Sequence, residues 1–508
     1  MDIYYRLARG RRLLAGRRLA PGALRTYFPV LNALGMVVMI FGLLMGFPLA
    51  VSLFLHDAAT VAYDEAILIT FGAGLALWTT TRGTRRDLRP RDGFLLVAAT
   101  WAAMPVFGSL PLIFYMPELS FTDAYFEAAS GLSTTGATVL TGLDKLPISI
   151  NLWRTFLHWV GGMGVIVLMV AILPLLGIGG RQVFKAEAPG PMKESSLTPR
   201  IAETAKGLWT VYTLITIACG VSLWAAGMEP WESLIHAFSI VGLGGFSSKD
   251  ASLGHFDSVP IELVTIAFAL IAACNYGTHY LALARRSFRP YAEDPEIRWF
   301  FAVQIIAVLF LTAYLTYFGA HEDLWTTLRY VAFHVVSIST ALGLATYDYT
   351  LWPMFAQMLI LFLGSFAPCS GSTGGGIKMV RAIILYQQVF REVVRSLHPA
   401  AVRPVRVGNA LVSDQVLHAV LGFSFMYMVS IVTLTLVLSA AGLEIITAFS
   451  AVVACINNTG PGLGAVGPAS NYQGLTDVQT WVLSFTMILG RLEIFTLLVV
   501  LTPTFWRR

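Results

Sequence analysis

The sequence predicts an all-α integral membrane protein with two N-terminal spans followed by four helix–pore loop–helix repeats around a pseudo-fourfold pore. Three observations carry this prediction: the apolar composition, the segregation of basic residues into alternate segments, and one glycine that recurs in register in four places. Of the 508 residues, 56% are apolar and 12% are charged. A water-soluble domain with this balance would expose large apolar patches, so the composition indicates a chain that lies in lipid.

The first predicted element is a pair of spans within residues 1–90. Apolar stretches long enough to cross a hydrocarbon core of about 30 Å recur from residues 28–55 to residues 481–502, with no polar domain between them. The N-terminus is too basic, and its first apolar run too long, for a cleaved signal peptide. We therefore expect residues 28–55 to be a retained span, preceded by a basic segment.

Lysine and arginine cluster in six blocks, which hold 29 of the 34 basic residues. The blocks contain seven residues in 1–25, five in 82–91, five in 181–206, four in 285–298, six in 378–406 and two in 507–508. Because basic residues stay on the cytoplasmic side of a membrane, we expect all six blocks on one face and both termini in the cytoplasm. This segregation also argues against a nucleic-acid partner, although the chain is basic overall.

After the N-terminal pair, the basic blocks divide the chain into four excursions across the membrane and back. These predicted repeats cover residues 91–206, 207–295, 296–406 and 407–508. Each holds two spanning stretches, and between them lies a shorter apolar stretch that ends in a Gly-, Thr- and Ser-rich patch. Irregular backbone at membrane depth is tolerated where it lines a water-filled cavity, so each short stretch is predicted to be a half-crossing pore helix. The chain would then make ten full crossings.

A glycine falls at the same place in all four patches. These glycines are Gly136, Gly245, Gly343 and Gly460, and they are 109, 98 and 117 residues apart. The period matches one excursion, which is typical of an internal repeat. An ion filter made of backbone carbonyls needs residues with positive φ, which glycine adopts without steric cost. Ordinary helix-packing glycines are the alternative, but they would not explain a fixed position after a short external helix.

Four motifs carry a resemblance to a known family. They are residues 131–138 (GLSTTGAT), 244–247 (GGFS), 371–378 (GSTGGGIK) and 457–462 (NNTGPG). In this order, over essentially the whole chain, they resemble the Trk/Ktr/HKT superfamily of potassium transporters, and specifically its bacterial TrkH-type subunits. The resemblance implies potassium uptake across the bacterial inner membrane, with K⁺ as the substrate and no cofactor bound by this chain. It also implies a homodimer and a cytoplasmic TrkA-like ring that binds NAD or ATP and docks on the basic loops.

The resemblance further implies that K⁺ binds at a selectivity filter made of each repeated glycine and the two residues before it. The filter residues are Thr134, Thr135, Gly136, Leu243, Gly244, Gly245, Ala341, Leu342, Gly343, Asn458, Thr459 and Gly460. Only the first patch resembles the Thr-Val-Gly sequence of potassium channels. The third patch departs furthest from a Thr-rich pattern.

Residues 365–376 interrupt an apolar run with residues that do not sustain a helix, which predicts a loop inside the membrane. The resemblance implies that this loop gates the pore beneath the filter; its residues are Gly371, Ser372, Thr373, Gly374, Gly375 and Gly376, together with Lys378. Arg491 lies 31 residues beyond Gly460, as Gly374 lies 31 beyond Gly343, so equal spacing would place Arg491 opposite the loop. A charge is expensive within a span and is usually functional there. A kink that packs against a neighbouring helix is the alternative.

Other function classes fit the sequence less well. A sodium- or proton-coupled secondary cation transporter is the main alternative, but its inverted repeats would hold odd numbers of spans, whereas the predicted repeats hold even numbers. An enzyme needs converging His, Asp or Glu side chains, and the spans hold almost none, so we expect no catalytic site. The four cysteines and nine histidines form no metal motif. A dinucleotide-binding glycine fingerprint is also lacking, so regulation by a nucleotide would require a partner.

Overall fold

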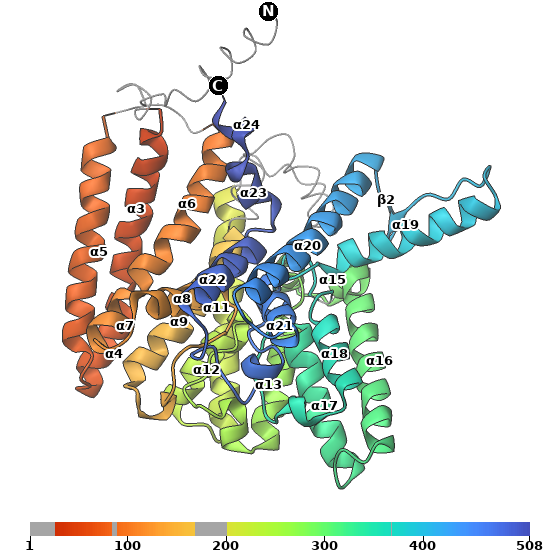
Figure 1. The fold of residues 1–508 in the computed structure, drawn as a ribbon, viewed down its shortest axis with the longest axis horizontal. Coiled ribbons are helices and arrows are strands. Elements are labelled where there is room, and N and C mark those ends of the chain that lie inside the picture. Colours follow the sequence, from red (N-terminus) through yellow and green to blue (C-terminus); the bar gives the residue numbers. More distant parts are fainter. Residues whose placement is uncertain (1–25, 84–88, 168–200, 367, 508) are drawn as a thin grey trace, which may run out of the picture.

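The computed structural model describes residues 26–83, 89–167, 201–366 and 368–507, and most of its elements are helices (Figure 1). The basic block in 1–25, most of the block in 181–206 and the end of the repeat predicted at 91–206 lie outside the described residues. Six helices of the described chain are long and apolar enough to cross a membrane: Phe28–Leu55, Thr60–Thr81, Arg91–Tyr115, Ala205–Ala225, Pro295–Tyr317 and Asp414–Ala440. The number rises to eight if each of two bent helix pairs is one span. The chain is therefore a multi-pass membrane protein.

The N-terminal hairpin stands at one side of the molecule (Figure 1). It consists of α3 (Phe28–Leu44), α4 (Gly46–Leu55) and α5 (Thr60–Thr81). A Cβ atom on Gly35 or on Gly74 would lie less than 3.0 Å from the backbone of the opposite helix, so α3 and α5 approach closely at these glycines. Asn32 Nδ2 also donates a hydrogen bond to Trp78 O, at 3.1 Å. Small residues hold helices together in a membrane by permitting this tight packing.

Four short helices each lie between two longer segments. The short helices are α8 (Phe121–Ser133), α12 (Pro230–Gly242), α17 (Leu324–Ser339) and α21 (Ile445–Ile456). The segments before them are α6 (Pro90–Gly108) with α7 (Leu110–Tyr115), α11 (Ile201–Ala225), α16 (Pro295–Tyr317) and α20 (Asp414–Ala440). The segments after them begin with α9 (Ile148–Val167), α13 (Val259–Ala272), α18 (Met354–Leu363) and α22 (Asp477–Arg491). In α8 every residue from Ala124 to Ser133 is buried, so this helix belongs to the interior of the molecule.

Polar side chains begin three of the four short helices. Ser120, Asp323 and Glu444 each accept a hydrogen bond from a backbone N–H group of the first turn. These caps satisfy donors that the helix itself leaves unpaired. A 3₁₀ turn follows each short helix along the chain: η1 (Leu143–Lys145), η4 (Ser252–Phe256), η5 (Tyr349–Leu351) and η6 (Gly464–Val466).

Three of the segments that follow the short helices are broken. The axis turns by 92° between α13 and α14 (Tyr276–Arg285), and by 116° between α22 and α23 (Phe495–Leu501). The 364–378 loop, whose described residues 364–366 and 368–378 are not helical, separates α18 from α19 (Met379–Leu397), where the sequence predicts a loop. Within the apolar stretch 481–502, Glu493 (φ 53°) and Ile494 (φ 54°) adopt positive φ, so the chain turns there.

The remaining elements lie at the margins of the bundle. They are α15 (Arg289–Glu293), the two-residue strands β1 (Arg406–Val407) and β2 (Ala410–Leu411), and α24 (Pro503–Trp506). α19 and the β1–β2 hairpin extend sideways from the bundle (Figure 1). Arg91 Nη1 donates a hydrogen bond to Arg507 O, at 3.2 Å, so two of the six basic blocks meet at one end of the molecule.

The charge distribution and the fold together generate a topology prediction. All four native cysteines are buried, so a membrane-impermeant maleimide should report introduced cysteines alone. Ala251 follows α12 on the predicted external side and Ser396 lies in α19 on the predicted cytoplasmic side, and both are exposed. We expect Ala251→Cys to react in intact cells, and Ser396→Cys to react only after the membrane is permeabilised. The reverse pattern of labelling would contradict the topology.

Candidate ion pathway

The four short helices end in the same backbone turn. Two residues before the repeated glycine, Thr134, Leu243, Ala341 and Asn458 adopt positive φ of 52–65°. In each turn the N–H group of the following residue donates to a carbonyl five residues earlier: Thr135 to Ser130, Gly244 to Ser239, Leu342 to Ser337 and Thr459 to Ala454, at 2.8–2.9 Å. This is the Schellman pattern of helix termination, in which glycine usually occupies the left-handed position. Here four different side chains occupy it, so the geometry repeats although the sequence does not.

The repeated glycines are required both by conformation and by space. Gly136, Gly245, Gly343 and Gly460 have φ between 79° and 92°. A Cβ atom on each would lie less than 3.0 Å from a carbonyl oxygen of the next turn: Gly244 for Gly136, Leu342 for Gly245, Thr459 for Gly343 and Thr135 for Gly460. The contacts run from the first turn to the second, third and fourth and back to the first. The turns 134–136, 243–245, 341–343 and 458–460 therefore form a closed ring, here called the four-turn ring.

Hydrogen bonds also join the four chain segments that follow the turns of the ring, numbered here in chain order. Gly254 N donates to Ala345 O (3.1 Å) between the second and third segments. Tyr349 Oη donates to Gly462 O (3.1 Å) between the third and fourth. Tyr472 N donates to Thr138 O (2.9 Å) between the fourth and first. We call each contact between neighbouring segments a seam. Each of these three seams is closed by a hydrogen bond to a main-chain carbonyl oxygen.

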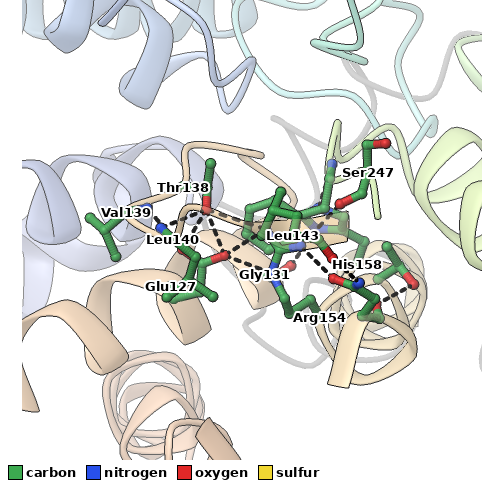
Figure 2. Close-up of polar contacts among 12 residues, drawn as sticks. Glu127, Gly131, Thr138, Val139, Leu140, Leu143, Arg154, His158 and Ser247 are labelled. Carbon is green, nitrogen blue, oxygen red and sulfur yellow. Dashed lines mark hydrogen bonds and ion pairs between the residues drawn. The ribbon is translucent and has the colours of Figure 1, made fainter. Parts of the chain in front are cut away.

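The seam between the first and second segments is built on α9 (Figure 2). The Arg154 guanidinium is buried and donates to Glu127 Oε1 at 2.8 Å and to Ser247 O at 3.0 Å. Glu127, in α8, also accepts a hydrogen bond from Val139 N at 3.0 Å. In the sequence, Arg154 is a charge within a predicted span, where charges are costly and usually functional. Glu127 was missed, although a carboxylate in the middle of a buried short helix is a signal that could have found it.

One helical turn after Arg154, His158 completes this seam (Figure 2). Its Nδ1 lies 2.7 Å from Gly131 O, and its Nε2 accepts a hydrogen bond from Phe246 N at 3.2 Å. Accepting at Nε2 requires the neutral tautomer that carries its proton on Nδ1. The side chain therefore ties the end of α8 to the residue after the second ring glycine.

A cavity of about 80 Å³ opens on one side of the four-turn ring. All four repeated glycines line it, together with Arg154 and Lys249. The Lys249 ammonium is held 3.1 Å from Glu232 Oε1 and 3.8 Å from Asp144 Oδ1, so its charge is balanced by carboxylates. The ring thus faces a space large enough for water or a small ion.

The 364–378 loop packs against the ends of three of the short helices. Thr373 Oγ1 donates to Val241 O of α12 at 3.2 Å. A Cβ atom on Gly374 would lie less than 3.0 Å from Thr340 O after α17, and one on Gly375 less than 3.0 Å from Asn457 O after α21. The glycines therefore let the loop lie directly against the main chain that leads into the four-turn ring.

The buried arginine and lysine of the predicted gate both bind loop carbonyls. Arg491 Nη1 donates to Thr373 O at 2.7 Å, and Nη2 donates to Gly161 O of α9 at 3.1 Å. Lys378 Nζ donates to Gly374 O. The structure thus brings Arg491, Lys378 and the loop together, as equal spacing of the third and fourth repeats predicts. Glu493 pairs instead with Arg381 of α19, at 2.7 Å, and not with Arg491.

Two further features fix the loop at its edges. Glu296 is fully buried at the start of α16 and accepts hydrogen bonds from Ser370 N (2.8 Å) and Val380 N (3.1 Å). Gly371 O accepts a hydrogen bond from Tyr276 N (3.1 Å) at the start of α14, so Gly371 lies beside the bend between α13 and α14. Glu296 could not be recognised from the sequence, because it follows an aspartate and a proline and so resembles an ordinary helix start.

Several buried polar atoms between the ring and the loop have no hydrogen-bond partner in the described chain. They are Thr134 Oγ1, Asn458 Oδ1, Thr459 Oγ1 and Arg491 Nε. Buried polar groups are normally paired with protein or ordered water. Water could pair with all four atoms, and a cation could take the three oxygen atoms as ligands, whereas the Arg491 Nε–H group needs an acceptor.

Comparison with known proteins agrees with this geometry. A family model described as TrkH, cation transport protein, matches residues 59–507. The chain is 44% identical over 479 residues to the Trk system potassium uptake protein TrkH of Salmonella typhimurium, covering 94% of this chain and 99% of the relative. It is 38% identical over 479 residues to the Trk system potassium uptake protein TrkG of Escherichia coli, covering 94% and 98%.

A solved structure is similar over the same extent. The crystal structure of the potassium transporter TrkH from Vibrio parahaemolyticus superposes with a TM-score of 0.87 at 41% identity, covering 95% of this chain and 100% of that one. The similarity thus extends over nearly the whole chain. The chain belongs to the TrkH family of cation transport proteins.

Proposed function

We propose that the chain takes up K⁺ across the bacterial inner membrane by conducting it through the four-turn ring. The closed ring of four left-handed turns is the observation that carries this proposal. Carbonyl groups at the C-terminal ends of helices carry partial negative charge, and four such ends meet at the ring. They offer a cation oxygen ligands in place of its hydration shell. Relatives named potassium uptake proteins support K⁺ as the ion.

The ion-binding residues proposed are those of the ring, from Thr134–Gly136, Leu243–Gly245, Ala341–Gly343 and Asn458–Gly460. Around them we propose the two-span hairpin within 1–90 and the four repeats 91–206, 207–295, 296–406 and 407–508. The ten crossings of this scheme need α9 and the α18–loop–α19 segment as spans, in addition to the six helices and two bent pairs that qualify by length and composition. Both termini would lie in the cytoplasm.

The 364–378 loop is the proposed gate, with Arg491 as its electrostatic part. The loop lies against the approach to the ring, and a guanidinium there repels a passing cation. A cytoplasmic TrkA-like ring that binds NAD or ATP would move the loop, in a complex with a homodimer of this chain. The ion pair between Arg381 of α19 and Glu493 supports this proposal, because it joins the helix that follows the loop to the break in the fourth repeat.

The first prediction concerns the ring. Gly245→Val should lower rubidium uptake into proteoliposomes at least tenfold, because a side chain at φ 84° meets the carbonyl of Leu342. Gly474→Val is the matched control, since nothing lies within 4 Å of the Cβ position there, and it should retain wild-type uptake. Normal uptake by folded Gly245→Val would contradict the assignment of the ring as the pore.

The second prediction concerns the gate. Deleting residues 372–375 should raise basal rubidium flux by removing the obstruction, and Arg491→Ala should raise it by removing the charge and its bond to Thr373 O. Potassium-to-sodium selectivity should not change, because the ring is untouched. Arg395→Ala, an exposed arginine of α19, is the charge-matched control. If both folded gate variants conduct no more than wild type in the absence of a partner, the loop is a packing element.

The third prediction concerns the seam built on α9. Glu127→Gln leaves the buried Arg154 without its counter-ion, and breaking one partner of a buried pair costs about 3–5 kcal/mol. We expect a lower unfolding temperature in detergent and a reduced potassium-to-sodium selectivity, since Ser247 and Val139 lose a fixed neighbour. The control Glu392→Gln disrupts an exposed pair with Arg395 and should change neither. Unaltered selectivity in Glu127→Gln would limit the pair to a role in stability.

A further inference from the structure

A second cavity lies away from the ring, beside the bend between α13 and α14. Its volume is about 1070 Å³, and α11, α13, α14, α15 and α16 contribute to its wall. Apolar side chains dominate the lining, among them Leu214, Ile215, Phe268, Leu283 and Phe301. Leu214 and Leu283 are at least half exposed, so the cavity is open to the surroundings of the helices. In a membrane-spanning bundle those surroundings include lipid chains.

The polar groups inside this cavity are already paired with one another. His279 lies between Tyr291 Oη, 2.7 Å from Nδ1, and Ile271 O, 2.9 Å from Nε2. Ile271 belongs to the last turn of α13, where the bend leaves carbonyls without helical partners. The interior therefore offers apolar surface and few free hydrogen-bonding groups, which suits a hydrocarbon chain better than a polar ligand.

The mouth of the cavity is basic. Arg286, Ser287 and Phe288 line it, and Arg285 and Arg289 flank them along the chain. In the described chain none of these three arginines forms an ion pair with a carboxylate. Phe288 is 86% exposed beside them, and basic residues close to the end of a span are typical of the cytoplasmic membrane–water interface. The segment thus combines a place at the interface with positive charge that no carboxylate of the described residues neutralises.

Hydrogen bonds to the 364–378 loop fix the bend beside this cavity. Cys369 N donates to Ala273 O (3.0 Å), and Tyr276 N donates to Gly371 O (3.1 Å), on either side of the bend. Asn275 Oδ1 accepts a hydrogen bond from Gly277 N (2.8 Å) and so starts α14. Because the wall is already fixed, a ligand would not have to order it, and preformed sites bind more tightly for that reason.

We propose that this cavity binds one anionic phospholipid, with an acyl chain against the α11–α13 wall and the phosphate at Arg286 between Arg285 and Arg289. The apolar interior accounts for the chain and the unpaired arginines account for the negative headgroup. Basic pockets between spans at the cytoplasmic interface are suited to such headgroups. The acyl chain of a zwitterionic lipid would fit the cavity equally well, but its headgroup has no net negative charge to neutralise the arginines.

The test is lipid titration of the full-length protein in detergent, followed by native mass spectrometry. Dioleoyl phosphatidylglycerol and dioleoyl phosphatidylcholine are the probes, because they share their chains and differ in net charge. Each basic residue near a membrane surface contributes about fivefold to affinity for anionic lipid. We therefore expect Arg286→Gln/Arg289→Gln to weaken phosphatidylglycerol binding about 25-fold. The control Arg395→Gln/Arg403→Gln removes the same charge on and after α19 and should bind as wild type does.

A cavity-filling variant tests the acyl-chain part separately. Ala218 lines the cavity on α11 and is exposed, so Ala218→Trp fills space without disturbing the interior. This variant should abolish tight binding of phosphatidylglycerol although all of the arginines remain. Equal binding of the two lipids by wild type, unchanged binding by the double arginine variant, or retained binding by Ala218→Trp would each overturn the proposal.

Discussion

The rest of the structure depends on one steric constraint, the closed contact between each ring glycine and the carbonyl of the next turn. A side chain at any of the four glycines would meet main chain that cannot move without opening the ring. The turns must therefore be placed accurately relative to one another, and four helices end there with the same pair of hydrogen bonds. Left-handed conformation at a non-glycine residue carries a cost of about 1 kcal/mol or more. That cost is borne at Thr134, Leu243 and Ala341, which indicates that the surroundings, and not local preference, fix these turns; asparagine, at position 458, adopts the conformation more readily.

Buried charged side chains hold the turns and the loop in place by forming hydrogen bonds with main-chain groups. Arg154 holds Ser247 O, Arg491 holds Thr373 O and Gly161 O, and Glu296 holds Ser370 N and Val380 N. A charge in a span costs several kcal/mol when alone, but less when it bonds to polar groups that would otherwise be unpaired. Irregular backbone in the membrane creates such groups. The charged side chains and the broken helices therefore stabilise each other.

The sequence predicts those parts of this arrangement that depend on glycine or on charge. The ring glycines, the non-helical 364–378 segment and the meeting of Arg491 with that segment all follow from spacing and composition. The bends after α13 and α22 could not be predicted in this way, because Cys274-Asn275 and Glu493-Ile494 are not typical helix-breaking pairs, and their conformation depends on contacts with the loop and with α19. The left-handed Leu243 and Ala341 were unpredictable for the same reason, since tertiary packing overrides their intrinsic preference.

The broken helices also join the loop to elements that lie away from the four-turn ring. On one side, the bend at residues 273–276 donates to and accepts from the loop at Cys369 and Gly371. On the other side, the break at residues 492–494 is joined through Glu493 to Arg381, the third residue of α19. α19 leaves the bundle and presents exposed apolar side chains such as Tyr386, Val389 and Leu397. Direct contacts therefore link α19, the loop and the fourth repeat, whereas the four-turn ring is held by its own four seams.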